Sequence, residues 1–343
     1  MYRKLLTIVL VGATTLITAC GGDDDAGSTT TPSTAASAPA SATSAPTSAT
    51  TAPETSAPGT DPVGAGGVPG STAPGTESVD AAPQAIVSLS PTHTEMLYAL
   101  GAGDQVLAVD NYSNYPPEAA EKMVGLDAFQ PSVEAIAALE PDLVVVQGGY
   151  DELVTQLEDL GIATFVGDAP ADLDAVYAQV EQLGARVERV GEAAELVLDM
   201  STRVDAAIAG LPQLDEPLTY YHELDNTYFS VTSDTFIGAV YAELGLVNIA
   251  DEGNADNPYP QLSSEYIIAA DPDLIFLADT KYSNESAVTV AARPGWETIA
   301  AVANGGVVEL DDDVASRWGP RIADYIEQVG AAVATVGALQ AAG

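Results

Sequence analysis

Apolar residues are concentrated after residue 85, where short apolar runs alternate with longer segments of helical spacing. The segment 86–90 predicts a short buried strand. A helix start follows directly, with Ser90 as the expected N-cap and Pro91 at the first helical position. A second strand is expected at 106–109. This order makes a βαβ unit, and the C-terminal loops of such units hold the ligand in open α/β sheets.

The same alternation continues to the C-terminus. Strands are expected at 143–146 and 163–166, with helices at 133–139 and 151–160 between them, which predicts a parallel, doubly wound lobe. Residues 171–211 have helical spacing almost throughout, and Gly184 is the one expected break. Further strands are expected at 219–224, 247–249, 274–278 and 307–310, with helices at 235–244, 263–270, 295–302 and 320–337.

Two segments of the chain repeat one pattern. VEAIAALEPDLVVV at 133–146 and SEYIIAADPDLIFL at 264–277 each read as a helix, an acidic-Pro-Asp-Leu turn and an apolar strand. Glu134 and Glu265 occupy corresponding places in the two copies. This internal repeat predicts two similar lobes.

The first 84 residues have a different composition. Arg3 and Lys4 precede an apolar run that is too short to span a membrane and ends just before Cys20. Residues 1–19 resemble a bacterial lipoprotein signal peptide with Cys20 as the lipidated residue; the alternative is an ordinary secretory signal cut elsewhere. Residues 20–84 are rich in Ser, Thr, Pro and Ala, which predicts a disordered linker. The N-terminal lobe is expected at 85–170, connecting helices at 171–214 and the C-terminal lobe at 215–343.

Charge and motifs exclude several classes of function. Ten basic and fifty acidic residues give a net charge of −40, so nucleic acid and anionic membrane surfaces are poor partners. The sequence has no GxSxG, HExxH or GxxxxGK[ST] motif, and we expect no enzymatic activity. The spacing of the His, Asp and Glu residues indicates no metal site, and no cofactor is expected. Asp311–Asp313 predicts an acidic turn before the last helix rather than a calcium loop.

The stretch SLSPTHTEMLYALGAGDQV, followed by VDNYSNYPPEA, resembles the start of the metal-chelate substrate-binding proteins of ABC importers. The similarity runs from about Ala85 to the C-terminus. It implies an α/β fold in which two Rossmann-like lobes with parallel sheets are joined by a single long α-helix; the alternative is a surface helix of one larger sheet. It also implies a monomeric, lipid-anchored, extracytoplasmic receptor that delivers a metal chelate to an ABC permease. The alternative is a surface sensor or scavenger without transport.

The resemblance also suggests ligands. A ferric siderophore is favoured over cobalamin (or another corrinoid) and haem, because Val146 and Val314 stand where cobalamin binders of the family often carry tryptophan. Haem ligation stays open because the chain has two histidines. His93 is expected at a helix start facing the cleft, and His222 lies beside two tyrosines. A structural role is the usual one for a lone histidine.

Site residues follow from strand ends and from the resemblance. Tyr112 and Arg317 match family positions. Aromatic residues near strand C-termini can stack on a bulky chelate, and Arg317 can pair with an anionic edge. The expected ligand-binding residues are Tyr112, Phe129, Tyr150, Tyr228, Tyr282, Arg317 and Trp318. The resemblance assigns Glu134 and Glu265 to docking on permease arginines; the alternative is a carboxylate that favours a helix N-terminus.

Overall fold

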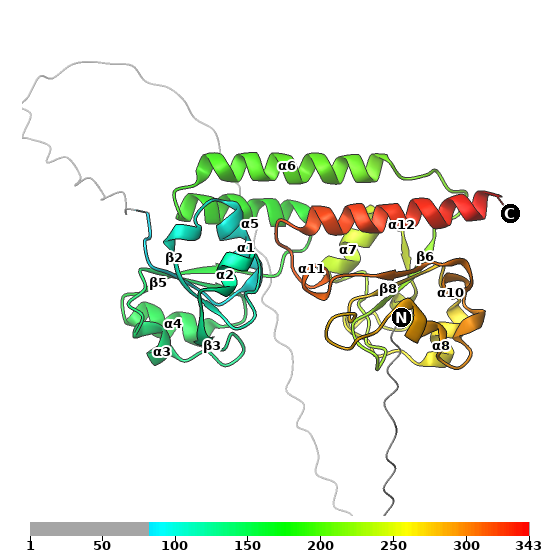
Figure 1. Cartoon of the computed structure of the whole chain (residues 1–343), viewed down its shortest axis with the longest axis horizontal. Coiled ribbons are helices and arrows are strands. Elements are labelled where there is room, and N and C mark those ends of the chain that lie inside the picture. The colour runs from blue at the N-terminus through cyan, green and yellow to red at the C-terminus, as the bar shows by residue number, and fades with distance from the viewer. Residues whose placement is uncertain (1–81, 343) are drawn as a thin grey trace, which may run out of the picture. The chain divides into compact units, whose positions relative to one another are not determined.

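The computed structural model describes residues 82–342, which form two α/β lobes (Figure 1). The expected signal peptide at 1–19, Cys20 and nearly all of the expected linker at 20–84 lie outside the described residues. Within 82–342, no helix combines the length and the apolar character needed to cross a membrane.

The N-terminal lobe is built on a five-stranded parallel sheet with the strand order β3-β2-β1-β4-β5. Its strands are β1 (Ile86–Ser88), β2 (Val106–Asp110), β3 (Met123–Leu126), β4 (Leu143–Gln147) and β5 (Ala163–Gly167). Its helices are α1 (Pro91–Ala99), α2 (Pro117–Ala120), α3 (Val133–Ala137) and α4 (Asp151–Asp159), with a 3-10 turn at Gly103–Gln105. Ser90 caps α1 and Pro91 begins it, as predicted.

The C-terminal lobe repeats this plan with four parallel strands in the order β7-β6-β8-β9. Its strands are β6 (Thr219–Glu223), β7 (Val247–Asn248), β8 (Leu274–Leu277) and β9 (Val307–Glu309). Its helices are α7 (Phe236–Glu243), α8 (Ser264–Ala270), α9 (Ala287–Ala291), α10 (Ala300–Asn304) and α11 (Asp312–Ala315), with 3-10 turns at Ile249–Asp251 and Trp296–Thr298. The single helix predicted at 295–302 is therefore a 3-10 turn followed by α10.

Three helices lie along one side of the lobes in Figure 1: α5 (Leu173–Arg186), α6 (Val190–Ala209) and α12 (Ile322–Ala342). The break expected at Gly184 is wrong. The chain turns instead after Arg186, where Glu188 adopts a left-handed φ of 56°. Gly184 lies inside α5, and a Cβ there would meet the Cβ of Ala193 on α6 at 2.5 Å, so glycine permits close helix packing. The 20-residue α6 is the long connecting helix, and the predicted two-lobed architecture is confirmed.

The repeated acidic-Pro-Asp-Leu turns have one structural role. The carboxylate of Asp142 accepts hydrogen bonds from the backbone N–H groups of Gln84 (2.7 Å) and Ala85 (3.0 Å), just before β1. Asp273 accepts one from the N–H of Thr219 (2.8 Å), where β6 begins. Each aspartate therefore fastens the first strand of its lobe to the strand that follows the turn.

One contiguous apolar core connects the lobes. It includes residues of both sheets and of α5, α6 and α12, while two smaller clusters cover the opposite faces of the two sheets. Successive residues of β4 alternate between these cores, since Leu143 belongs to the shared core and Val144 to a smaller one. This explains the continuous β-branched run of that strand.

Candidate functional site

An aromatic cavity of about 450 Å³ lies between the lobes. The N-terminal lobe contributes loops that follow β2, β3 and β4, and the C-terminal lobe contributes the loop after β8 and the segment between α11 and α12. Six of the seven predicted ligand-binding residues line this cavity: Tyr112, Phe129, Tyr150, Tyr282, Arg317 and Trp318. Phe129 and Tyr282 are 66% and 67% exposed, so wide aromatic faces are available to a ligand.

Tyr228, the seventh, does not line the cavity. Its ring stacks on the fully buried Trp296 with centroids 5.7 Å apart, and the guanidinium of Arg293 lies 5.5 Å from its centroid. The loop after β6 folds back onto the C-terminal lobe, so this prediction placed Tyr228 wrongly.

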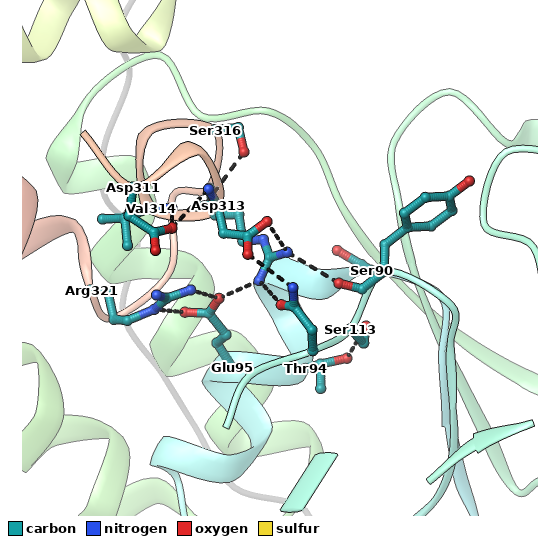
Figure 2. A network of polar contacts seen from close by, with 12 residues as sticks. Ser90, Thr94, Glu95, Ser113, Asp311, Asp313, Val314, Ser316 and Arg321 are labelled. Carbon is teal, nitrogen blue, oxygen red and sulfur yellow. Dashed lines mark hydrogen bonds and ion pairs between the residues drawn. The ribbon is translucent and has the colours of Figure 1, made fainter. Parts of the chain in front are cut away.

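Buried polar groups fix the loop that carries Tyr112. The carboxylate of Asp110, at the end of β2, accepts hydrogen bonds from the Tyr112 N–H (2.6 Å) and the Ser113 hydroxyl (2.7 Å). Ser113 also bonds the hydroxyl of Thr94 on α1 at 2.9 Å, as Figure 2 shows. Burial raises the pKa of Asp110, and these two donors oppose the rise. The Tyr112 ring then meets Phe129 edge to face at 5.0 Å.

A buried ion network, here called the interlobe clasp, joins the lobes beside the cavity; it consists of Glu95, Asn114, Asp313, Arg317 and Arg321. Arg317 donates to Glu95 (2.9 Å), the Asn114 side chain (3.0 Å), Asp313 (2.9 Å) and the carbonyl of Tyr112 (3.1 Å). Its side chain is only 8% exposed. The Arg317 guanidinium therefore serves mainly to hold the lobes together, although the residue borders the cavity.

Glu95 is the centre of the clasp. Its carboxylate, 2% exposed, also receives two bonds from Arg321, at 2.8 and 2.5 Å (Figure 2). Asp313 accepts bonds from Asn114 (2.9 Å) and the Tyr282 hydroxyl (3.0 Å), and pairs with Lys281. Burial acts to raise the pKa of Asp313, but these partners outweigh it and hold the pKa below its usual value.

Trp318 forms the inner wall of the cavity. Its indole N–H donates to Gln179 of α5 (3.2 Å), and its ring meets that of His93 edge to face at 6.4 Å. His93 itself is fully buried between Ser90 (2.7 Å) and Gln179 (3.2 Å), so the expectation that it faces the cleft is wrong. Burial lowers its pKa to about 4.

His222 is also fully buried, and its Nδ1 bonds the Tyr241 hydroxyl at 2.8 Å. Burial lowers its pKa to about 3. Neither imidazole reaches the cavity, so both histidines have the structural role. Within residues 82–342, no group of three or more His, Cys, Asp or Glu side chains is placed to hold a metal ion.

Val146 and Val314 were expected to weigh against cobalamin, but their positions in the structure do not support this. Val146 is 1% exposed in a core strand, and Val314 packs against the shared core. Neither lines the aromatic cavity. Sequence reasoning also missed Glu95, Asn114 and Arg321. Glu95 and Asn114 lie in the two stretches quoted for the family resemblance, 88–106 and 109–119, but no spacing rule connects either residue to Arg321.

The repeated glutamates occupy equivalent places in the two lobes. Ser132 and Ser263 cap α3 and α8, and Glu134 and Glu265 are the second residues of these helices. Both side chains are exposed. Figure 1 shows α3 and α8 on the opposite side of the strands from α6. A hydrogen bond from its own backbone and one from Ser132 lower the pKa of Glu134, which keeps it ionised.

Comparison with known proteins gives consistent results. The family model described as periplasmic binding protein matches residues 86–314. A cobalamin-binding protein of Halobacterium salinarum is 32% identical over 255 residues, covering 72% of this chain and 68% of that protein. The crystal structure of the periplasmic vitamin B12 binding protein BtuF of Vibrio cholerae aligns with a TM-score of 0.63 and 27% identity, covering 74% of this chain and 98% of that one. The apo periplasmic heme-binding protein RhuT from Roseiflexus sp. RS-1 aligns with a TM-score of 0.64 and 25% identity, covering 74% and 99%.

Proposed function

The chain belongs to the periplasmic binding protein family, and on that premise we propose that it captures a corrinoid of the cobalamin type outside the cytoplasm and delivers it to an ABC transporter permease. The choice of ligand rests on the aromatic cavity between the lobes. Arg317, which borders this cavity, is already paired with Glu95 and Asp313. The named relatives support the same choice, since one is a cobalamin-binding protein and one a vitamin B12 binding protein.

The charges around the cavity favour a neutral chelate. Among the described residues, the one basic side chain that lines it is Arg317, which is paired with Glu95 and Asp313. Lys281, nearby, is paired with Asp313. A catecholate siderophore or the carboxylates of haem would enter a site with no uncommitted cation, and removing their charge from water would be costly. The ferric siderophore favoured by the sequence therefore becomes the second candidate.

The remaining groups of the cavity suit an amide-rich macrocycle. Tyr112, Phe129, Tyr150 and Tyr282 offer aromatic faces for stacking, and Gln147 and Thr92 offer hydrogen bonds to neutral amides. Because the shared core and the interlobe clasp both connect the lobes, we expect only a small closure on binding. No covalent step is required of the protein.

Docking on the permease is assigned to Glu134 and Glu265. Two exposed carboxylates, one on each lobe and at equivalent helix starts, can each accept a bidentate pair from a permease arginine. The lipoprotein-like segment ending at Cys20 supports attachment to the outer face of the cell membrane, so that the receptor acts as a tethered monomer beside its permease.

The test is a ligand panel on the detergent-solubilised full-length chain. Cyanocobalamin, ferric siderophores and haemin are compared by thermal shift and calorimetry. A ligand present at a hundred times its Kd stabilises the native state by about 2.7 kcal/mol if it binds only that state. We expect a saturable shift with cyanocobalamin and none with a ferric catecholate. A shift confined to a siderophore or to haemin would refute the choice of ligand, and silence across the panel would refute the proposed class.

A further inference from the structure

Asp279 follows β8 at the C-terminal edge of the second sheet, and its carboxyl group is buried without a partner. The residue is 2% exposed, and in the part of the chain that the structure describes neither carboxylate oxygen accepts a hydrogen bond. An ionised carboxylate in such a place loses its hydration and receives no bonds in exchange, which is costly. Asp279 does not line the aromatic cavity, so a direct contact with the ligand does not explain its position.

The charges packed around Asp279 are mostly negative. Glu223 is fully buried at the end of β6, and Glu285 lies on the same loop as Asp279. Arg293 donates two bonds to Glu223 (2.7 and 2.6 Å) and one to Glu285 (3.0 Å). Asp312, at the start of α11, is near enough to add a third negative charge. One guanidinium therefore already serves two carboxylates, and an ionised Asp279 would add a further like charge.

Other titratable groups border this cluster. Burial raises the pKa of Tyr221 on β6 well above its usual value, and Glu223 and Asp279 add to the rise, so this hydroxyl stays neutral. Burial also raises the pKa of Glu223, but its bonds from Arg293 oppose the rise. Glu309, at the end of β9, is exposed. Burial, followed by the nearby carboxylates, raises the pKa of Asp279 to about 7, so Asp279 is placed to change charge near neutral pH.

Asp279 begins a loop that carries one wall of the aromatic cavity. The backbone N–H groups of Lys281 and Tyr282 each donate to the Asp312 carboxylate at 3.0 Å. Tyr282 lines the cavity, and its hydroxyl donates to Asp313 of the interlobe clasp at 3.0 Å. Only two residues separate Asp279 from Tyr282, so a displacement of the buried carboxyl group moves a wall of the cavity.

We infer that Asp279 is a proton-controlled switch for the loop 279–286: its neutral form holds the loop closed with Tyr282 in the cavity wall, and its ionised form opens the loop. The strands β6 and β8 are each paired on both sides, so the loop is the element that can move to bring the carboxylate to water. A chelate and a proton then favour the same closed state, and each strengthens binding of the other. The inference rests on the proposed function and adds control of that same cavity by pH.

The first experiment measures the Kd of cyanocobalamin by calorimetry on the full-length chain at pH 5.5, 7.0 and 8.5. Burial lowers the pKa of His93 to about 4 and that of His222 to about 3, so neither imidazole changes charge in this range. If only the protonated form binds, a pKa of about 7 for Asp279 limits the rise in Kd from pH 5.5 to pH 8.5 to about thirtyfold. We expect a rise of roughly tenfold, since some closed loop persists when the group is ionised.

Three variants identify the group responsible. Asp279→Asn keeps the shape of the side chain without its charge and should bind cyanocobalamin equally well at all three pH values. Asp205→Asn, at an exposed position of α6, is the matched control and should follow the wild type. Glu285→Gln removes a neighbouring carboxylate and frees Arg293 from one partner, so the midpoint of the pH profile should move to lower pH. A purely structural role of Asp279 would not move this midpoint.

A measurement without ligand keeps the two proposals separable. Hydrogen exchange of the amides of Lys281 and Tyr282, divided by the intrinsic rate at each pH, should show protection that falls above pH 7 in the wild type and stays constant in Asp279→Asn. A wild-type Kd that is independent of pH, or one that changes equally in Asp279→Asn, overturns the inference and leaves the proposed function standing. If the wild type binds no corrinoid, the proposed function fails, and exchange alone decides on the switch: protection that falls in the wild type alone supports it, and protection independent of pH overturns it.

Discussion

Neutralising Glu95 should destabilise the protein far more than neutralising an exposed glutamate does. Glu95 is 2% exposed and accepts one bond from Arg317 and two from Arg321, whose side chains are 8% and 17% exposed. Glu95→Gln keeps the shape of the side chain but leaves two largely buried guanidinium groups without their shared anion. Breaking a buried ion pair from one side typically costs 3–5 kcal/mol. Because Arg317 retains Asp313, we expect a loss near the lower limit, about 3 kcal/mol.

Glu327→Gln provides the matched control. Glu327 pairs with Arg203 on the surface, where the two side chains are 45% and 33% exposed. Exposed pairs of this kind contribute roughly 0–1 kcal/mol. Chemical denaturation of both variants gives the free energies of unfolding, and thermal scans should show the midpoint of Glu95→Gln lowered by roughly 8 °C.

A mutant cycle then shows whether the loss comes from the clasp. Because Glu95 and Arg321 share bonds, the double variant Glu95→Gln, Arg321→Met should be less destabilised than the sum of the two single variants. A loss below about 1 kcal/mol for Glu95→Gln, or strict additivity in the cycle, would mean that this carboxylate does not join the lobes.

Three other expectations follow. Asp279 is 2% exposed, its carboxylate oxygens have no partner within residues 82–342, and burial raises its pKa from 3.8 to about 7. The unfolded state loses this proton near pH 3.8 and the native state holds it up to about pH 7, so wild-type stability falls as the pH rises between these values. The advantage of Asp279→Asn over wild type in denaturant titrations should therefore grow by roughly 2 kcal/mol between pH 5 and pH 8; a constant difference would contradict this. The net charge of −40 predicts that raising NaCl from 0.05 to 1 M raises the thermal midpoint through screening, and a lowered midpoint would count against it. Glu134→Ala with Glu265→Ala should abolish corrinoid uptake by cells without weakening binding, whereas the exposed pair Glu152→Ala with Glu243→Ala should leave both intact; normal uptake in the first double variant would remove the docking assignment.

Local patterns in the sequence predicted most of the fold. The β-branched runs, the Ser90 cap and the repeated acidic-Pro-Asp-Leu turns each depend on neighbours in the chain, and each appears in the structure. The failure at Gly184 has a local cause as well, because a glycine inside a helix gives the same signal as one that ends it. The helix α5 ends because Glu188 adopts a left-handed conformation, which a glutamate at this position does not predict.

The candidate site was predictable only in part, because tertiary contacts between distant segments determine the rest of it. Aromatic residues after parallel strands meet at one edge of a sheet, so Tyr112, Phe129, Tyr150 and Tyr282 reached the aromatic cavity. Arg317 and Trp318 lie between α11 and α12, and the family resemblance had pointed to Arg317. Tyr228 did not reach the cavity, because the direction of its loop is set by packing on Trp296. The interlobe clasp joins Glu95 to Arg317 across 222 positions of sequence, and no periodicity or spacing rule connects residues that far apart.

The affinity of cyanocobalamin for the wild-type full-length chain and for two phenylalanine variants tests directly whether the aromatic cavity holds a corrinoid. Phe129, 66% exposed, lines the aromatic cavity, while Phe229, 37% exposed, lies outside it. Calorimetry should give one saturable site in the wild type, a Kd raised roughly tenfold by Phe129→Ala, and no change with Phe229→Ala. Absence of corrinoid binding by the folded wild type, or tight binding that Phe129→Ala leaves unaltered, would contradict the account.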